Sequence, residues 1–252
     1  MADEILVSSD GAVMELRLNR PEKKNAITAA MYSALADGLA AAEADSAIRV
    51  ATITGTGGIF TSGNDLKDFQ ETPPIGADKP VYRFISGIAS FSKVLIAGVD
   101  GAAVGIGTTM LLHCDIVFAS PAALFHMPFV DLGLVPEAGS SLLFPQLVGP
   151  QAAARHLILG EPFDAEAAVR YGLVAEVVAA DALDARVRAA AERIAAKPPE
   201  AVRLTKRLIR GDRTPVEQRY REEGELFAER LQSPEAAEAF QAFFEKRAPV
   251  FR

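Results

Sequence analysis

The sequence predicts an α/β fold whose strands alternate with helices through the first two-thirds of the chain, followed by a helical C-terminal region. Short apolar, β-prone segments recur at 50–54, 94–99 and 115–119. Loops containing glycine follow the first two of these segments, and from residue 151 onward the apolar spacing becomes almost wholly helical. With 252 residues, half of them hydrophobic, the chain can form one large core that carries a smaller helical extension.

The first predicted elements are a strand and an amphipathic helix. Apolar and polar side chains alternate along 13–18, which is typical of a strand, and the turn residues 19–21 end it. We expect Thr28 to cap the helix that follows. The apolar stripe of this helix consists of four residues at helical spacing, namely Met31, Leu35, Leu39 and Ala42.

The middle of the chain contains two units in which a strand leads through a glycine loop to a helix. Strand 94–99 is apolar on both faces, as in a buried strand, and its loop leads to a short helix that ends at His113. Strand 50–54 begins the other unit. After its loop we expect an irregular segment over 70–80, which contains three prolines, and then a helix over 81–92.

The C-terminal helices are marked by capping and breaking residues. Asp164 is expected to cap a helix that Gly172 ends, a proline pair at 198–199 separates two longer helices, and Ser233 opens the last one. One side of the last helix carries Ala236, Phe240, Phe243 and Phe244. A lone terminal helix cannot hide this much aromatic surface, so we expect a partner subunit or the body of the domain to cover it.

Charge and cysteine content exclude several classes of partner. A formal net charge of -7 and a pI near 5.1 leave no overall positive field for binding a polyanionic duplex. Cys114 is the only cysteine, which excludes an intrachain disulfide and, given its apolar neighbours, indicates a buried side chain. The first ten residues do not resemble a signal peptide, and no apolar stretch is long enough to span a bilayer. We therefore expect a cytoplasmic protein without nucleic-acid or membrane partners.

Nucleotide and metal motifs are incomplete in this chain. The glycines at 105–107 suggest a dinucleotide fingerprint, but Met110 occupies the place of its third glycine, and no P-loop lysine motif is present. His113, His126 and His156 lack the spacing of metal ligands, so we interpret them as structural or surface histidines and expect no metal. The two glycine loops instead suit an oxyanion, because glycine brings backbone N–H groups close to a ligand and a helix start leaves such donors unpaired.

Three long segments together resemble the enoyl-CoA hydratase/isomerase family, the crotonases, and the likeness continues to both ends of the chain. They read GTGGIFTSGNDLKDF at 55–69, GAAVGIGTTMLLHCDIVFAS at 101–120 and FHMPFVDLGLVPEAGSSLLFP at 125–145, with LNRPEKKNAIT at 18–28 and FEKRAPVF near the C-terminus. The resemblance implies a crotonase-type (ClpP/crotonase) α/β core of repeated ββα units over 1–196. It also implies a helical oligomerisation region at 197–252 that supports trimers or hexamers.

The resemblance also assigns the candidate catalytic groups. The backbone N–H groups of Asn64 and Ile106 match the two donors of the family's oxyanion hole. At the positions of the two hydratase glutamates this chain has Thr109 and Phe129, and neither can act as an acid or base at neutral pH. Glu137 lies where the 3-enoyl-CoA to 2-enoyl-CoA isomerases of the family carry their glutamate, so the chain is most similar to that branch.

Isomerisation of an acyl-coenzyme-A thioester is therefore the expected activity, with no cofactor beyond the coenzyme A of the substrate itself. One carboxylate can take a proton from C2 and return it to C4. The residues that the resemblance places against the substrate are Lys24, Ala26, Ser62, Gly63, Asn64, Asp65, Leu66, Ile106, Phe129 and Lys246.

Other interpretations stay open on the sequence alone. A hydratase, lyase or hydrolase could recruit a different acid, such as Asp68 or Asp131, and a catalytically silent protein could bind acyl-CoA without turnover. Composition alone favours a solvated surface for Lys24, Lys246 and Glu137. The acyl pocket is built from apolar side chains, for which Phe84, Phe91 and Leu95 are guesses.

Overall fold

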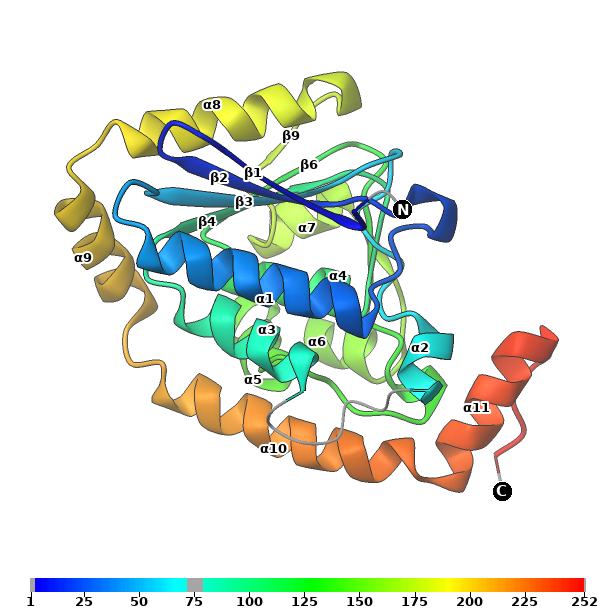
Figure 1. Cartoon of the computed structure of the whole chain (residues 1–252). Coiled ribbons are helices and arrows are strands. Elements are labelled where there is room, and N and C mark those ends of the chain that lie inside the picture. The colour runs from blue at the N-terminus through cyan, green and yellow to red at the C-terminus, as the bar shows by residue number, and fades with distance from the viewer. Residues whose placement is uncertain (1–2, 72–78, 252) are drawn as a thin grey trace.

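The computed structural model describes residues 3–71 and 79–251 and is organised around one large sheet (Figure 1). Its six strands lie in the order β1-β2-β3-β4-β6-β9. The first pair is antiparallel and all the other neighbours are parallel. The strands are β1 (Ile5–Asp10), β2 (Val13–Leu18), β3 (Val50–Gly55), β4 (Val94–Val99), β6 (Ile116–Ala119) and β9 (Glu176–Val177).

The predicted strands β2, β3, β4 and β6 are all present, but β1 was not predicted. Only Ile5 of β1 is buried, so the strand lacks the apolar alternation that identified β2. It forms because the turn at Gly11, with φ of +58°, folds it back onto β2 as an edge strand. A strand that depends on its partner in this way leaves little signal in its own residues.

A second sheet of three short strands was also missed. It contains β5 (Ala102–Val104), β7 (Leu124–His126) and β8 (Phe163–Asp164), in the order β5-β7-β8. The first two are parallel and β8 is antiparallel to β7. Because β8 and β9 lie beyond residue 151, the expectation of an almost wholly helical C-terminal third was wrong at these two points. Strands of two residues cannot show a period, and only their partners define them.

Eleven α-helices surround the sheets within the described part of the chain. They are α1 (Ala29–Ala44), α2 (Leu66–Glu71), α3 (Pro80–Ser90), α4 (Ile106–Thr109), α5 (Ser140–Val148), α6 (Pro150–Leu157), α7 (Ala165–Tyr171), α8 (Leu183–Ala195), α9 (Pro199–Arg210), α10 (Thr214–Leu231) and α11 (Pro234–Glu245). Short 3₁₀ turns are η1 (Pro21–Lys23), η2 (Met110–His113), η3 (Val130–Leu132) and η4 (Ala180–Ala182).

The predicted caps are confirmed. Thr28 accepts the N–H of Met31 at the start of α1, and Asp164 and Ser233 accept corresponding N–H groups at the starts of α7 and α11. Gly172 ends α7 in the left-handed conformation. The helix expected over 81–92 is α3, whereas most of the irregular segment expected over 70–80 lies outside the described residues.

The large sheet separates two hydrophobic cores. Side chains of β4 alternate, so that Leu95 and Ala97 face the core shared with α1 and α3, whereas Val94 and Ile96 face the core shared with α8. Figure 1 shows the same layers, with α8 over one face of the sheet and α1 and α3 under the other. The first core is the larger and continues toward α10, which places it next to the residues considered below.

The helices after residue 197 form the expected C-terminal helical region, although a domain boundary at that position stays a prediction. Tyr220 and Phe227 of α10 join the main core. On α11, Ala236 and Phe240 are buried against the body, while Phe243 and Phe244 remain 59% and 51% exposed. The body of the protein thus covers one part of the aromatic side. Within residues 3–71 and 79–251, no helix combines the length and apolar character needed to cross a membrane.

Candidate active site

The two glycine loops, residues 55–65 and 100–107, lie side by side at one edge of the sheet. They follow β3 and β4, which are adjacent and parallel, so both leave the sheet at the carboxyl ends of their strands. The Thr61 N–H donates to the Ala102 carbonyl at 2.9 Å, and the Val104 N–H donates to the Thr61 carbonyl at 3.0 Å. Backbone pairing of this kind fixes the position of one loop against the other.

Gly63 is required where the loops approach most closely. Its φ is +88°, and a Cβ atom at this position would lie 2.8 Å from the Val104 carbonyl oxygen. Both the backbone conformation and the space therefore exclude a side chain. The contact is with backbone atoms, which cannot rotate away as a flexible side chain could.

The N–H groups of Asn64 and Ile106 have no acceptor among the described residues, although their neighbours are paired. The Gly63 N–H donates to Thr61 Oγ1 at 3.0 Å, and the Asp65 N–H donates to the Ile27 carbonyl at 2.9 Å. Ile106 is the first residue of α4, where no carbonyl of the same helix can reach its N–H. Two unpaired donors thus lie on adjacent loops, while their proposed role stays a prediction.

Lys24 and Ala26 lie beside the first glycine loop, as expected from the resemblance. The Ser62 N–H donates to the Lys24 carbonyl at 3.0 Å, and the Ile27 N–H donates to the Gly63 carbonyl at 2.8 Å. Asn25 between them was not singled out from the sequence. It is fully buried with φ of +52°, and its side-chain amide donates to two carbonyls of the segment 56–59. Asparagine adopts a positive φ more readily than most residues. This preference was the only feature of the sequence that could have identified Asn25 as a structural residue of the loop.

Asp65 and Leu66 connect the first glycine loop to α2. The Asp65 carboxylate accepts the N–H groups of Lys67 and Asp68 and forms an ion pair with Arg20 at 2.7 Å. Partial burial raises the pKa of Asp65, but the hydrogen bonds and the ion pair outweigh it and hold the pKa below its usual value. Leu66 packs against the main core. Both residues therefore anchor the loop.

Glu137 is buried with an incomplete set of hydrogen bonds, contrary to the surface position that composition alone favours. Its side chain is 7% exposed, and Oε1 has no hydrogen-bond partner in the described chain. Burial, and to a smaller extent the nearby negative charge of Glu223, raise the pKa of Glu137 to about 8. A carboxylic acid with this pKa can exchange a proton near neutral pH.

A small cavity of about 20 Å³ lies beside Glu137. The residues that line it with Glu137 are Phe69, Val81, Tyr82, Ile85, Ala138, Tyr220, Gly224 and Phe227. Tyr32 connects this region to the first glycine loop, because its hydroxyl donates to Asn64 Oδ1 at 2.5 Å. Burial raises the pKa of Tyr32, and so does the negative charge of Glu137.

The positions that match the hydratase glutamates are both buried. Thr109 is fully buried and its Oγ1 has no partner among the described residues, while Phe129 is 4% exposed within the main core. Phe129 does not line the cavity beside Glu137, and neither do the acyl-pocket candidates Phe84, Phe91 and Leu95. Side chains of α2, α3 and α10 line it instead. The contribution of α10 was missed because its lining residues, Tyr220, Gly224 and Phe227, lie more than eighty positions after Glu137 in the chain.

The remaining candidates are more distant from Glu137. Lys246 ends α11 with an exposed side chain, and no hydrogen bond among the described residues joins it to either glycine loop. Asp68 accepts the Ala29 N–H at 2.8 Å and so caps α1, while Asp131 is exposed in η3. Another cavity, of about 910 Å³, lies between α9 and the sheet, and Glu137 does not line it.

The three histidines and the cysteine have structural surroundings. His126 and His156 hydrogen-bond to backbone carbonyls of Gly160 and Glu161 at 2.8 and 2.7 Å. Burial raises the pKa of the Cys114 thiol to about 12, which confirms the expected buried side chain and makes it a poor nucleophile. His113 is buried close to Glu137 and is considered further below.

The fold, the paired glycine loops and the buried Glu137 beside them define a protein of the crotonase class. Residues 8–252 match the family model described as enoyl-CoA hydratase/isomerase, and the chain belongs to this family. A solved enoyl-CoA hydratase/isomerase from Pseudoalteromonas atlantica T6c superposes with a TM-score of 0.94 at 43% identity, over 99% of this chain and 100% of that one.

Curated relatives carry both isomerase and hydratase names. Human enoyl-CoA delta isomerase 2 is 38% identical over 82% of this chain, which spans only 54% of the length of that relative. A probable enoyl-CoA hydratase from Mycobacterium tuberculosis is 37% identical over 84% of each chain. Similarity therefore establishes the family and leaves the choice of reaction to the site.

Proposed function

We propose that the chain is an enoyl-CoA isomerase that converts a 3-enoyl-CoA thioester into its conjugated 2-enoyl isomer. The observation that carries this proposal is Glu137, a buried carboxyl group with one unpaired oxygen and a pKa of about 8. It lies beside a small apolar cavity, and neither hydratase position, Thr109 or Phe129, supplies a second acid. A 1,3-proton shift needs only one such group.

In the proposed reaction the ionised Glu137 carboxylate removes a proton from C2 of the substrate. The electrons of that C–H bond move into the thioester and give a dienolate, whose oxygen accepts the N–H groups of Asn64 and Ile106. The protonated Glu137 then returns the proton to C4, which leaves the double bond between C2 and C3. No water and no cofactor takes part in this sequence.

Binding of the coenzyme A arm is assigned to the segment 24–26 and to the first glycine loop from Ser62 to Leu66. Hydrogen bonds between these two segments support the assignment. Ile106 contributes its N–H group, whereas the family-based roles of Phe129 and Lys246 have less support, because Phe129 is buried away from the cavity and Lys246 is exposed on α11. Assembly into a homotrimer or hexamer is part of the same proposal.

The test follows the absorbance of the conjugated thioester while the purified protein acts on 3-hexenoyl-CoA. We expect Glu137→Gln to lose about 10²- to 10⁴-fold in kcat, the range for removal of a general acid–base. Asp131→Asn is the matched control, because Asp131 is an exposed acid on the 3₁₀ turn that precedes Glu137 in the chain. Wild-type kcat/KM should also rise with pH through about 8, as Glu137 ionises.

The alternatives give different results when 2-hexenoyl-CoA is also supplied as substrate and free coenzyme A is measured. A hydratase removes the absorbance of 2-hexenoyl-CoA by adding water, and a hydrolase releases free coenzyme A. A silent binding protein retains acyl-CoA affinity without any change in absorbance. Full activity of Glu137→Gln on the 3-enoyl substrate would contradict the assignment of the base.

A further inference from the structure

The turn that presents Glu137, residues 137–141, has an unusual backbone. Ala138 has φ of +59° and Gly139 has φ of +74°, so two consecutive residues are left-handed. Ala138 is also 1% exposed. A residue with a Cβ atom is strained in this region, and it remains there only where its surroundings hold it.

Glu223 of α10 accepts hydrogen bonds from backbone N–H groups of this turn. Its Oε2 accepts the Gly139 N–H at 2.6 Å and its Oε1 accepts the Ser141 N–H at 2.9 Å. Both donors lie at the N-terminus of α5, where N–H groups are unpaired and a negative charge is favoured. The Glu223 side chain is 4% exposed, so the surrounding protein restricts its position.

His113 of η2 hydrogen-bonds to a backbone carbonyl group of the same turn. Its Nε2 lies 2.7 Å from the Ala138 carbonyl oxygen, and its Nδ1 lies 3.1 Å from a guanidinium nitrogen of Arg213. Since the carbonyl can only accept and the guanidinium can only donate, the imidazole is neutral with its proton on Nε2. Burial lowers the pKa of His113 to about 3, despite its bond to Ala138, which agrees with this state.

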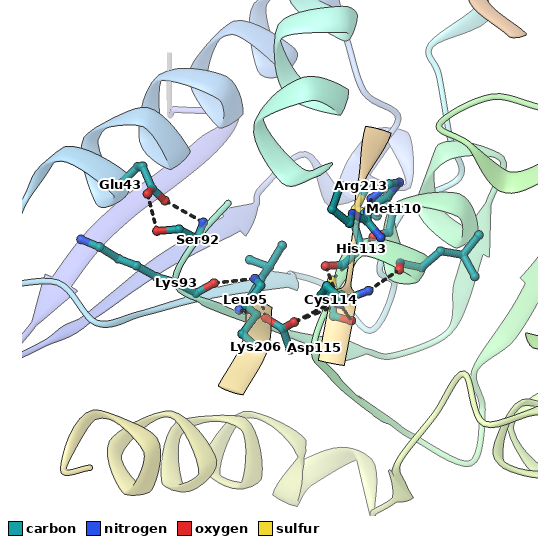
Figure 2. A network of polar contacts seen from close by, with 12 residues as sticks. Glu43, Ser92, Lys93, Leu95, Met110, His113, Cys114, Asp115, Lys206 and Arg213 are labelled. Carbon is teal, nitrogen blue, oxygen red and sulfur yellow. Dashed lines mark hydrogen bonds and ion pairs between the residues drawn. The ribbon is translucent and has the colours of Figure 1, made fainter. Parts of the chain in front are cut away.

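Residues of the C-terminal helices hold His113 in turn, and Figure 2 shows Arg213 beside it. Arg213 immediately precedes α10. Arg210 of α9 donates to the carbonyls of Leu112, His113 and Cys114, and it forms an ion pair with Asp115 at 3.0 Å. The C-terminal helices therefore reach the Glu137 turn by two routes, one through Glu223 and one through Arg213, Arg210 and His113.

We propose that Glu223 and His113 are positioning residues that together hold the turn 137–141 in its left-handed conformation and aim the Glu137 carboxyl group at the substrate. This inference rests on the proposed function of Glu137. Neither side chain lines the cavity beside Glu137, so both act through the backbone of the turn.

The charge of Glu223 has a measurable effect on the pKa of Glu137. The titratable groups that face Glu137 are Tyr32 of α1, Tyr82 of α3, and Tyr220 and Glu223 of α10. Glu223 is the one carboxyl group among them in the described chain. Its charge raises the pKa of Glu137, so its removal lowers that pKa.

The first experiment separates geometry from charge at Glu223. We expect Glu223→Ala to lower kcat about 10²-fold with little change in KM, because the turn loses its acceptor and the base is displaced. Glu223→Gln keeps an acceptor oxygen but loses the charge, so its kcat falls less and the acid limb of its kcat/KM profile moves to lower pH. Asp164→Asn is the matched control, since Asp164 caps α7 in the same way.

The second experiment compares His113→Gln with His113→Leu. Glutamine can still donate to the Ala138 carbonyl and leucine cannot, so we expect about tenfold higher kcat for His113→Gln. The same two substitutions at His156 are the control, because His156 is equally buried and also bonds to a backbone carbonyl. Equal effects at positions 113 and 156 would show a structural role and would overturn the proposal.

A measurement without substrate keeps the inference separate from the proposed reaction and covers variants that fold poorly. The side-chain carboxyl resonance of Glu137 is titrated by ¹³C NMR in folded wild type and Glu223→Gln, with Glu137→Gln for assignment. A lower midpoint and faster exchange of the Gly139 amide in Glu223→Gln support the proposal, and an unchanged midpoint and exchange rate overturn it. If the wild type shows no isomerase activity but the Glu137 carboxyl group titrates as expected, the isomerase assignment is contradicted and the positioning role of Glu223 is not.

Discussion

The two halves of the candidate site are held in place by different means. Backbone hydrogen bonds between Thr61 and the segment 102–104, together with the glycine at position 63, fix the two glycine loops. Side chains from remote helices, Glu223 and His113, hold the Glu137 turn instead. The loop half is thus held by backbone groups of the two loops themselves, whereas the glutamate half depends on side chains from other elements that pack around it.

This difference separates what each half can contribute to catalysis. Backbone donors keep their chemistry whatever the neighbouring side chains are, which suits their proposed role of holding an oxyanion. A carboxyl group takes its pKa from its surroundings, so the elements around Glu137 can tune it. A substitution near Glu137 can therefore change its pKa while the two glycine loops remain the same.

The largest expected effect concerns the stability of the glutamate half. Burial raises the pKa of Glu137 from 4.5 to about 8, so its protonated form stabilises the fold at low pH and this stabilisation is lost as pH rises toward 8. Glu137→Gln removes the titrating carboxyl group and with it this dependence of folding stability on pH. We expect its stability relative to wild type to increase by a few kcal/mol between about pH 5 and about pH 9, measured by urea unfolding.

The exposed Glu22 provides the control for this measurement. Glu22→Gln removes a carboxyl group of the same type from the surface, and its stability relative to wild type should stay nearly constant over the same pH range. If the free energies of unfolding of Glu137→Gln and Glu22→Gln, relative to wild type, changed with pH in the same way, Glu137 would be solvated in solution.

The next effect concerns the loop half. Gly63→Ala places a Cβ atom 2.8 Å from the Val104 carbonyl oxygen at a φ of +88°, so the first loop must move. We expect kcat/KM to fall about 10²-fold, as for other displacements of about 1 Å. Gly149→Ala also places a Cβ atom at a positive φ, +83°, but with no other atom within 4 Å, and it should lower stability without lowering activity.

The smallest effect concerns the contact between the halves. Tyr32→Phe removes the hydroxyl that donates to Asn64 Oδ1 at 2.5 Å and leaves the packing of the ring unchanged. A hydrogen bond of this kind is worth about 1 kcal/mol, so we expect kcat/KM to fall about fivefold. Tyr171→Phe, which removes the hydroxyl bonded to His156, should have no such effect on steady-state kinetics.

The same division decides how much could be predicted from the sequence. The strands β3 and β4, the glycine loops and the caps Thr28, Asp164 and Ser233 depend on neighbouring residues, and all were predicted. The edge strand β1 and the short strands of the second sheet depend on partners and were missed.

The site divides in the same manner. Motif context placed Glu137 correctly inside the protein, against the preference of its residue type for the surface. Nothing in the local sequence of Glu223 distinguishes it from the other acids of α10, because its function depends on donors 84 and 82 residues away along the chain. Only the packing of α10 against α5 brings these groups together.

The distance along the chain between Glu137 and Glu223 also sets an order for protein synthesis. A ribosome that has released the first 200 residues has delivered both glycine loops and Glu137, but not the carboxylate that restrains the turn. All residues of the large sheet and of both glycine loops therefore leave the ribosome before the residue that restrains the Glu137 turn. In the proposed function, catalytic competence is thus one of the last properties that this polypeptide acquires.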